Sequence, residues 1–259
     1  MYEKIKEKIH NKYIGRNIYY VKSTDSTNLL AKRESNLDDG TVFMADEQTQ
    51  GRGRNGKIWI SQNNDGLWMS ILLKPDINPE KLSALTLIAG LCVVKTLREK
   101  YDADAFIKWP NDIVLSKKKL GGILCEAAFS DGLLSYAVVG IGINLFQESF
   151  DDEIENIACS LYGVYDKKVD KQMLCADILN IFEPMYEEFL KNGIDTFLAE
   201  YKNYCITLGK EIRVIKDGVE ENAVAVDITN SGELIVESQQ GESTVFSGEV
   251  SVRGLFDYI

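Results

Sequence analysis

Two long apolar segments joined by Ser130-Asp131-Gly132 place the firmest constraint on the fold of this 259-residue chain. They read KLGGILCEAAF before the turn and LLSYAVVGIGINLF after it. An Asp-Gly pair between two apolar runs is a strong signal for a tight turn between antiparallel strands. A third segment, GLWMSILLK at 66–74, is strand-like and mostly apolar, so we expect burial on both of its faces. The sequence therefore predicts a long β-hairpin and a buried strand.

Helices and shorter strands are expected around these segments. The stretch at 24–35, TDSTNLLAKRES, reads as a short helix whose start can be capped by Ser, Thr or Asp. The stretch at 80–100 follows Pro79 and repeats apolar residues at helical spacing, which predicts a long helix. Further helices are expected at about 170–190 and 194–205, and a short strand at 41–46. Two more short strands are expected in 105–115. Pro110 separates them, because proline cannot donate a hydrogen bond to a β-ladder.

Beyond Gly209 the sequence changes to short alternating segments separated by turn signals. These turns are marked by Asp217-Gly218, Ser231-Gly232 and Gln240-Gly241. Regularly spaced short strands with tight turns are typical of a small barrel. We therefore divide the chain into an α/β domain of catalytic size at 1–207 and a small all-β domain at 208–259.

Charge and rare residue types narrow the possible functions. The net charge is −11, whereas nucleic-acid binding draws on clustered positive charge, so DNA and RNA are not expected as main partners. No apolar run approaches the ~18 residues that span a bilayer, and no membrane association is expected. The single histidine, His10, is expected on a charged helical face at the N-terminus. A single histidine disfavours His-based metal sites and Ser/His/Asp triads, and leaves only a Cys/His pair as a possible catalytic arrangement of histidine. Five scattered cysteines without a signal peptide fit the reducing cytoplasm.

In an acidic protein an anionic ligand needs a local group of basic residues, and QGRGRNGKIW at 50–59 supplies one. The stretch contains Gly-x-Gly-x-x-Gly, the fingerprint of a dinucleotide-binding turn, which requires a long helix directly after it. The residues that follow are turn formers and an Ile-Trp-Ile cluster that prefers strand, so the dinucleotide interpretation fails. Arg52, Arg54 and Lys57 can instead donate to a carboxylate or a phosphate, and glycine permits close backbone approach. The alternative is a turn-rich loop without a ligand.

Four more segments carry groups that suit a ligand site. STN at 26–28 offers three neutral hydrogen-bonding side chains, or is simply a helix N-cap. KWPND at 108–112 puts a cation, an aromatic ring and two polar groups around a bend, or is an ordinary turn. Lys119 precedes a Gly-Gly strand entry and can equally be a surface charge. GIGIN at 140–144 ends an apolar strand in Asn144, and glycines within a strand often mark close approach of a ligand or another backbone.

In this order and spacing, DSTN, QTQGRGRNGKIW, KWPNDI, KKLGGILCE and GIGINL resemble the motifs of biotin protein ligases. The resemblance runs from about Thr24 to Asn144 and extends more loosely through the C-terminal part. It implies an α+β fold in which helices flank a central mixed β-sheet, as in class II aminoacyl-tRNA synthetases and biotin ligases. It also implies a small C-terminal SH3-like β-barrel.

The resemblance implies a two-step reaction. ATP and the carboxylate of biotin first give biotinyl-5′-AMP and pyrophosphate. A lysine on a biotin carboxyl carrier protein or domain of a biotin-dependent carboxylase then takes the biotinyl group and releases AMP. ATP implies Mg²⁺, held mainly by phosphate oxygens. Asp112 is near enough in sequence to help, but the sequence assigns no metal ligand.

The same resemblance implies two catalytic residues, Lys119 and Arg54. Lys119 is the lysine that bridges the biotin carboxylate and the α-phosphate, and Arg54 belongs to the loop that closes over the intermediate. The implied biotin-binding residues are Ser26, Thr27, Asn28, Gln48, Gly51, Arg52, Gly53, Arg54 and Lys119. The implied ATP-binding residues are Arg54, Lys57, Trp59, Asn111, Lys119 and Asn144.

The sequence departs from the family pattern in two places. Only 25 residues precede Ser26, too few for the helix-turn-helix domain that repressor members carry, which predicts a ligase without DNA-binding activity. Lys57 stands where many relatives have arginine, which keeps the charge but loses the planar fork. The nearest alternative is a lipoate–protein ligase of the same fold, but its RRxxGGG-type motif and histidine-containing strand are not visible. The expected oligomeric state is a monomer or a homodimer.

Overall fold

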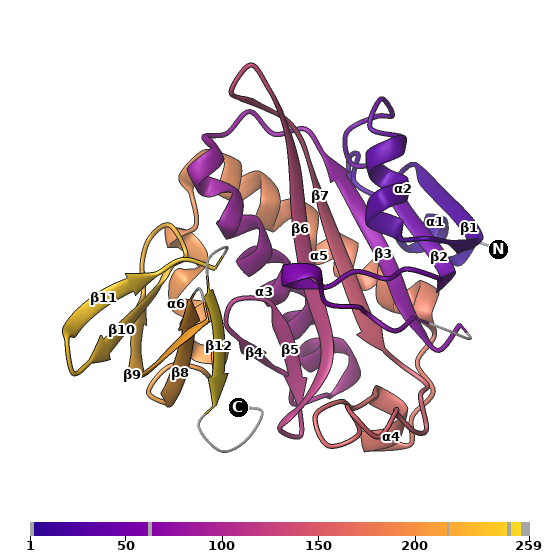
Figure 1. Cartoon of the computed structure of the whole chain (residues 1–259). Coiled ribbons are helices and arrows are strands. Elements are labelled where there is room, and N and C mark those ends of the chain that lie inside the picture. The colour runs from indigo at the N-terminus through magenta and orange to yellow at the C-terminus, as the bar shows by residue number, and fades with distance from the viewer. Residues whose placement is uncertain (1–2, 62–63, 217, 248–249, 255–259) are drawn as a thin grey trace.

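The computed structural model describes residues 3–61, 64–216, 218–247 and 250–254. The larger domain contains strands β1 (Ile18–Thr24), β2 (Val42–Gln48), β3 (Gly66–Leu73), β4 (Phe106–Lys108), β5 (Asp112–Leu115), β6 (Lys118–Ser130) and β7 (Leu133–Asn144). Within the described residues they form a seven-stranded sheet in the order β1-β2-β3-β7-β6-β5-β4 (Figure 1). β1 and β2 run parallel, and the other neighbouring strands are antiparallel, so the sheet is mixed as expected.

The predicted hairpin is the longest strand pair of this sheet. Asp131 and Gly132 connect β6 to β7 with φ angles of 53° and 79°. Two successive residues with positive φ form the turn whose twist matches paired strands, and Asp-Gly tolerates this conformation. β3 pairs with the other edge of β7, and every residue of β3 is buried, which confirms the expectation for 66–74.

Helices cover both faces of the sheet (Figure 1). On one face, α3 (Leu82–Tyr101) and α5 (Lys171–Asn192) pack on apolar side chains of alternate strand positions, such as Leu67, Met69 and Ile71 of β3. On the other face, α2 (Thr27–Arg33) packs on a smaller cluster that includes Phe43, Leu72 and Val138. The remaining helices are α1 (Glu3–Lys8), α4 (Leu161–Tyr165) and α6 (Asp195–Tyr204), with 3-10 turns η1 (Arg54–Gly56) and η2 (Pro79–Lys81). The small α2 cluster leaves much of that face free for the glycine-arginine loop at 50–59.

Three local features differ from the sequence-based expectation. β1 was not predicted, because this edge strand is half exposed and its apolar residues do not alternate cleanly. The short α4 was also not predicted. The N-terminal helix ends at Lys8, so His10 does not lie on a helical face. It is exposed, and its backbone N–H donates to Asn180 Oδ1 at 2.9 Å.

The C-terminal domain is a five-stranded antiparallel sheet in the described residues, as an SH3-like domain requires, with the order β11-β10-β9-β8-β12. Its strands are β8 (Glu211–Lys216), β9 (Val219–Ile228), β10 (Leu234–Ser238), β11 (Gly241–Val245) and β12 (Val250–Gly254). The turns fall at Gly218, Gly232 and Gly241, as predicted, while Asp217 lies outside the described residues. The indole N–H of Trp109 donates to the carbonyl of Gly232 at 3.0 Å, which joins this domain to the bend between β4 and β5.

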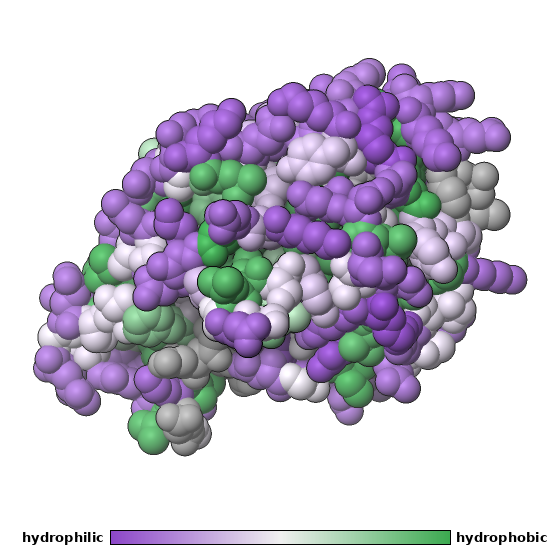
Figure 2. All heavy atoms as spheres, turned by 90° about the horizontal axis from the view of Figure 1, so that it is seen from above, coloured by the Kyte–Doolittle hydropathy of each residue, from purple (hydrophilic) through white to green (hydrophobic). Residues whose placement is uncertain are grey.

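Figure 2 shows the molecule from above, and hydrophilic side chains dominate this face with scattered hydrophobic ones among them. Phe129 and Leu133, beside the turn between β6 and β7, are among the large apolar side chains that remain exposed. Among the described helices, none combines the length and the apolar character that crossing a membrane demands.

A buried carboxylate fastens the N-terminal segment to helix α5. Glu183 on α5 is only 4% exposed. It accepts hydrogen bonds from the backbone N–H groups of Lys12, Tyr13 and Ile14. Such charge-assisted bonds are stronger than neutral ones, and a buried N–H that loses its acceptor pays its full desolvation cost.

We therefore expect Glu183→Ala to lower the free energy of unfolding by about 3 kcal/mol, since it leaves three backbone donors without their acceptor. Urea denaturation of the whole chain measures this loss. Glu187→Ala is the matched control, because Glu187 lies one turn further along α5 and pairs with the exposed Lys12. It should cost less than about 1 kcal/mol. Equal losses in the two variants would contradict the structural role of Glu183.

Candidate active site

The glycine-arginine loop between β2 and β3 folds into a compact hairpin. Trp59 N–H donates to the carbonyl of Gly51 at 2.8 Å, and Gly53 N–H donates to that of Lys57 at 2.7 Å. A Cβ atom on Gly51 would lie 2.1 Å from the Trp59 oxygen, so the close approach requires glycine. The three-residue turn η1 and then β3 follow, instead of a long helix. The dinucleotide interpretation is therefore excluded. Figure 1 shows η1 in front of β6 and β7, on the α2 side of the sheet.

Beneath this loop, neutral polar side chains form a buried hydrogen-bond network. The Thr27 N–H and hydroxyl donate to Gln48 Oε1 at 2.8 and 3.1 Å, and Gln48 Nε2 donates to Ser61 Oγ at 2.8 Å. Ser70 Oγ lies 2.7 Å from Thr27 Oγ1 and 2.6 Å from Asn28 Oδ1. These five residues are 0–8% exposed. Their amide and hydroxyl groups give the site a neutral floor with fixed donors and acceptors.

Two glycines on β7 make room for this arrangement. A Cβ atom on Gly140 would lie 2.2 Å from Asn28 Oδ1, and one on Gly142 would lie 2.9 Å from Trp59 Nε1. Trp59 also meets Trp68 of β3 edge to face, with ring centroids 6.2 Å apart. The GIGIN glycines therefore let other segments of the same chain pack closely on the sheet. Close approach of a ligand and close approach of another part of the chain were the two possibilities that their sequence left open.

The catalytic candidates lie at the end of the site nearest the C-terminal domain. Lys119 Nζ is 2.5 Å from Asp112 Oδ1 and 5.3 Å from the centre of the Trp59 ring. Arg54 Nη1 donates to Asn111 Oδ1 at 3.0 Å, and its Nη2 donates to the carbonyl of Ser247. Burial lowers the pKa of Arg54, and the nearby Asp112 opposes this shift. Arg54 of the loop, Lys119 of β6 and the carboxylate of Asp112 thus converge beside the neutral network.

Several predicted residues lie outside the buried hydrogen-bond network. Ser26 is buried at the N-cap position of α2, but its side chain makes no capping hydrogen bond. Asn144 ends β7 and donates to the carbonyl of Cys159 at 3.1 Å, so its amide is engaged away from the network. Lys57 is exposed on the loop, and Arg52 Nη1 lies 3.6 Å from Glu126 Oε1.

The structure also adds residues that sequence reasoning did not assign. Ser70 is the one polar side chain in the apolar strand GLWMSILL, a signal that could have marked it. Ser61 and Glu126 join the network or its border. Asp112, which the sequence placed nearby without a role, is the partner of Lys119.

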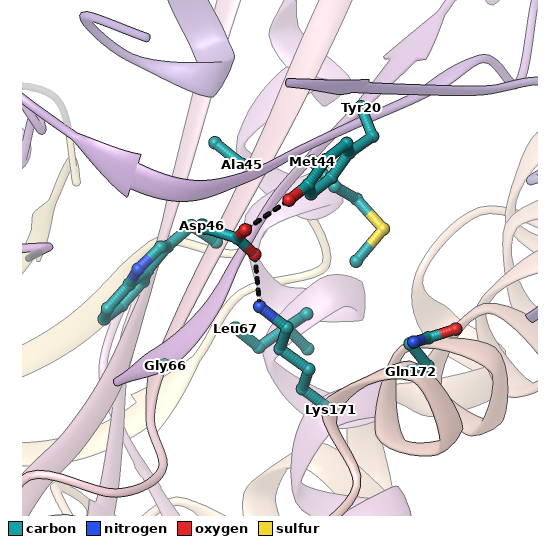
Figure 3. A pocket seen from close by; sticks show the side chains of 9 residues that line it. Tyr20, Met44, Ala45, Asp46, Gly66, Leu67, Lys171 and Gln172 are labelled. Atoms are coloured by element: carbon teal, nitrogen blue, oxygen red, sulfur yellow. Dashed lines mark hydrogen bonds and ion pairs between the residues drawn. The ribbon is translucent and has the colours of Figure 1, made fainter. Parts of the chain in front are cut away.

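A separate hollow lies between β2, β3 and the start of α5 (Figure 3). The Tyr20 hydroxyl donates to Asp46, whose Oδ1 lies 2.5 Å from Lys171 Nζ. Met44 and Leu67 supply part of its apolar lining. Its described lining includes no residue predicted for the active site. The ion pair therefore fastens α5 to the sheet, away from the cluster of predicted residues.

Both domains of the chain are similar to known proteins. The chain matches the Biotin/lipoate A/B protein ligase family over residues 18–144 and the Biotin protein ligase C terminal domain over residues 207–253. It is 33% identical over 243 residues to the bifunctional ligase/repressor BirA of Bacillus spizizenii, with 92% of this chain and 75% of the relative covered. It is 30% identical over 243 residues to the biotin–[acetyl-CoA-carboxylase] ligase of Mycobacterium tuberculosis, with 91% and 88% covered.

The chain belongs to the biotin protein ligase family. It is therefore an enzyme of the ligase class. Among solved structures, the biotin protein ligase of Aquifex aeolicus in complex with biotin and ATP superimposes with a TM-score of 0.82 at 31% identity, covering 92% of this chain and 99% of that chain. The fold predicted from the resemblance, with its central mixed sheet and small C-terminal β domain, is confirmed.

A side chain at position 140 should destabilise the protein. Gly140→Ala places a methyl group against Asn28 Oδ1, so Asn28 must leave Ser70. We expect the free energy of unfolding to fall by about 2 kcal/mol, the cost of breaking a buried polar contact and overpacking the site. Urea denaturation measures the change.

Gly90→Ala serves as its control. Gly90 lies within α3, where a Cβ atom would be 4.0 Å from Ile113 Cδ1. Alanine has the higher helix propensity, so this variant should be as stable as the parent or more stable by up to about 1 kcal/mol. A Gly140→Ala protein as stable as Gly90→Ala would refute the tight packing of Asn28.

Proposed function

We propose that this ligase activates biotin with ATP and transfers the biotinyl group to a lysine of a biotin carboxyl carrier domain. The observation that carries the proposal is the convergence of Lys119 and Arg54 beside a neutral hydrogen-bonding floor. A ligand with a neutral polar ring system and an anionic end fits such a site. Biotin has this character, with a ureido group at one end and a carboxylate at the other.

The first step requires two anions to meet. The carboxylate of biotin attacks the α-phosphorus of ATP, the new C–O–P bond forms, and pyrophosphate leaves. Lys119, poised 2.5 Å from Asp112, is the cation assigned to bridge the carboxylate and the α-phosphate. A positioned cation offsets their repulsion as charge develops, and in a sheltered site it acts more strongly than in water.

The neutral floor is assigned to the ring of biotin. Thr27, Asn28 and Gln48 present amide and hydroxyl groups whose orientations the network fixes. Ser26, buried at the start of α2, is assigned to the same pocket. Gly51, Arg52, Gly53 and Arg54 form the loop that is proposed to cover the bound acid and the intermediate. Such a cover protects a mixed anhydride from hydrolysis.

The nucleotide is assigned to Arg54, Lys57, Trp59, Asn111, Lys119 and Asn144, the residues that the motifs of the family imply. Among the described residues, no group of three or more His, Cys, Asp or Glu could hold a metal ion. Mg²⁺ is therefore proposed to arrive with ATP and to be held mainly by phosphate oxygens, with Asp112 as the nearby carboxylate. The ion neutralises phosphate charge when bound.

The second step is proposed to need no covalent enzyme intermediate. The amine of the acceptor lysine attacks the carbonyl of biotinyl-AMP, an amide forms, AMP leaves, and the amine loses a proton. Burial raises the pKa of all five cysteine thiols, to about 12 for Cys125, Cys159 and Cys175. A thiol that stays protonated at neutral pH is a poor nucleophile, which supports direct transfer.

The acceptor is proposed to be the carrier protein or domain of a biotin-dependent carboxylase, in the cytoplasm, where the five free cysteines stay reduced. The net charge of −11 opposes a role in DNA binding. It also means that substrate anions are attracted by the local cations of the site and not by the field of the whole protein.

Pyrophosphate exchange into ATP tests the first step. With Mg²⁺, we expect exchange that depends on biotin and not on lipoate. Lys119→Ala should reduce the rate by about a hundredfold or more, since it removes the bridging charge. Lys118→Ala is the matched control, because the neighbouring Lys118 points to the exposed carbonyl of Glu155 and should leave the rate unchanged. Exchange with lipoate alone would indicate a lipoate ligase, and exchange with neither acid would refute the proposed function.

Arg54→Gly tests the role of the loop tip. The variant loses the contacts to Asn111 and to the carbonyl of Ser247, so the loop should open more readily. We expect biotinyl-AMP to escape about tenfold faster or more, measured as the half-life of the complex after rapid gel filtration. Arg213→Ala, which removes an exposed pair with Glu220 in the C-terminal domain, should retain the intermediate like the parent. Retention by Arg54→Gly as long as that of the parent would show that the loop tip does not hold it.

A further inference from the structure

Glu126 on β6 lies at the border of the site and joins three separate elements. Its Oε2 accepts a hydrogen bond from Asn28 Nδ2 at 2.8 Å. Its Oε1 accepts one from Lys32 Nζ at 2.6 Å and lies 3.6 Å from Arg52 Nη1. One carboxylate thus connects α2, β6 and the glycine-arginine loop. The side chain is 19% exposed, so it is sheltered from water without being closed off.

The first consequence concerns the orientation of Asn28. An ionised carboxylate can only accept hydrogen bonds, so the Asn28 amide must turn its NH₂ group toward Glu126. Its Nδ2 also lies 3.2 Å from the carbonyl of Leu124, a second acceptor. Asn28 Oδ1 then faces Ser70 Oγ at 2.6 Å. The Glu126 carboxylate, together with the Leu124 carbonyl, therefore sets which atoms Asn28 turns toward the floor of the site.

The second consequence concerns the loop. Arg52 is 47% exposed at its side chain, and Glu126 is the carboxylate with which it pairs. The opposite end of the same hairpin is held by Arg54 through Asn111. The pair with Glu126 is thus one of the contacts that fasten the loop to the sheet.

Glu126 is charged at neutral pH. Burial alone would raise its pKa, but the hydrogen bonds from Lys32 and Asn28 and the nearby charge of Arg52 hold the pKa below its ordinary value. The orientation of Asn28 and the attraction for Arg52 therefore persist throughout the neutral range.

We infer that Glu126 is a positioning residue of the ligase, which orients Asn28 toward the bound acid and holds Arg52 of the loop against the sheet. The inference rests on the proposed function, since Asn28 and Arg52 are assigned to biotin. Glu126 is assigned no contact with the reacting atoms. Its loss should therefore weaken binding of biotin and leave the chemical step nearly intact.

Glu126→Gln keeps the shape of the side chain and removes its charge. Biotin-dependent pyrophosphate exchange at pH 8 should show a KM for biotin raised about tenfold or more, with kcat within about twofold of the parent. Glu126→Asp, which keeps the charge, should restore part of the affinity. Lys32→Met is the matched control, because it removes the ion pair but leaves the contacts of Glu126 with Asn28 and Arg52. Its KM should stay within about twofold of the parent.

A second measurement judges the loop contact without relying on activity. Trypsin cleaves after Arg52 and Arg54 when the loop leaves the sheet, so cleavage without ligand should be faster in Glu126→Gln than in the parent and unchanged in Lys32→Met. Thermal unfolding checks that the variants are folded. An unchanged KM in folded Glu126→Gln, or equal effects in Glu126→Gln and Lys32→Met, would overturn the inference. If the parent shows no exchange with biotin, the proposed function fails, and the trypsin comparison still tests the hold on Arg52.

Discussion

The arrangement of the site depends on the space above two glycines of β7. Gly140 and Gly142 lack the Cβ atoms that would collide with Asn28 and Trp59. Because of this space, α2 can place its first turn on the sheet, and the loop after β2 can lie across the same face. The polar network and the cations next to it are built from side chains that these two segments bring. A steric constraint on one strand thus controls how two distant segments meet.

Electrostatics explains how cations are kept in place in an acidic chain. Lys119 is paired with Asp112, Arg52 lies near Glu126, and Arg54 donates to an amide oxygen and a backbone carbonyl. Each positive charge has an acceptor that fixes its position before any ligand arrives. Preorganised charges need little rearrangement when an anion binds, and this property supports the adenylation step that we propose.

Local signals in the sequence were sufficient for much of the fold. Asp131 and Gly132 specify their turn by their own backbone preferences, and Pro110 separates β4 from β5 because it cannot donate to a ladder. β1 was missed because a half-exposed edge strand carries little apolar periodicity. His10 was wrongly placed on a helix because charged residues gave no signal for the helix end at Lys8.

The sequence by itself determined the family, because the motifs are short and each carries its residues at fixed spacing. Only the tertiary structure decided which partner each side chain has. Asn28 and Glu126 are 98 residues apart in sequence, and Arg54 and Ser247 are 193 apart. Ser70 joins the network because the register of β3 turns its side chain toward α2. Such partners follow from the order of strands in the sheet and from packing on its faces, which no local pattern encodes.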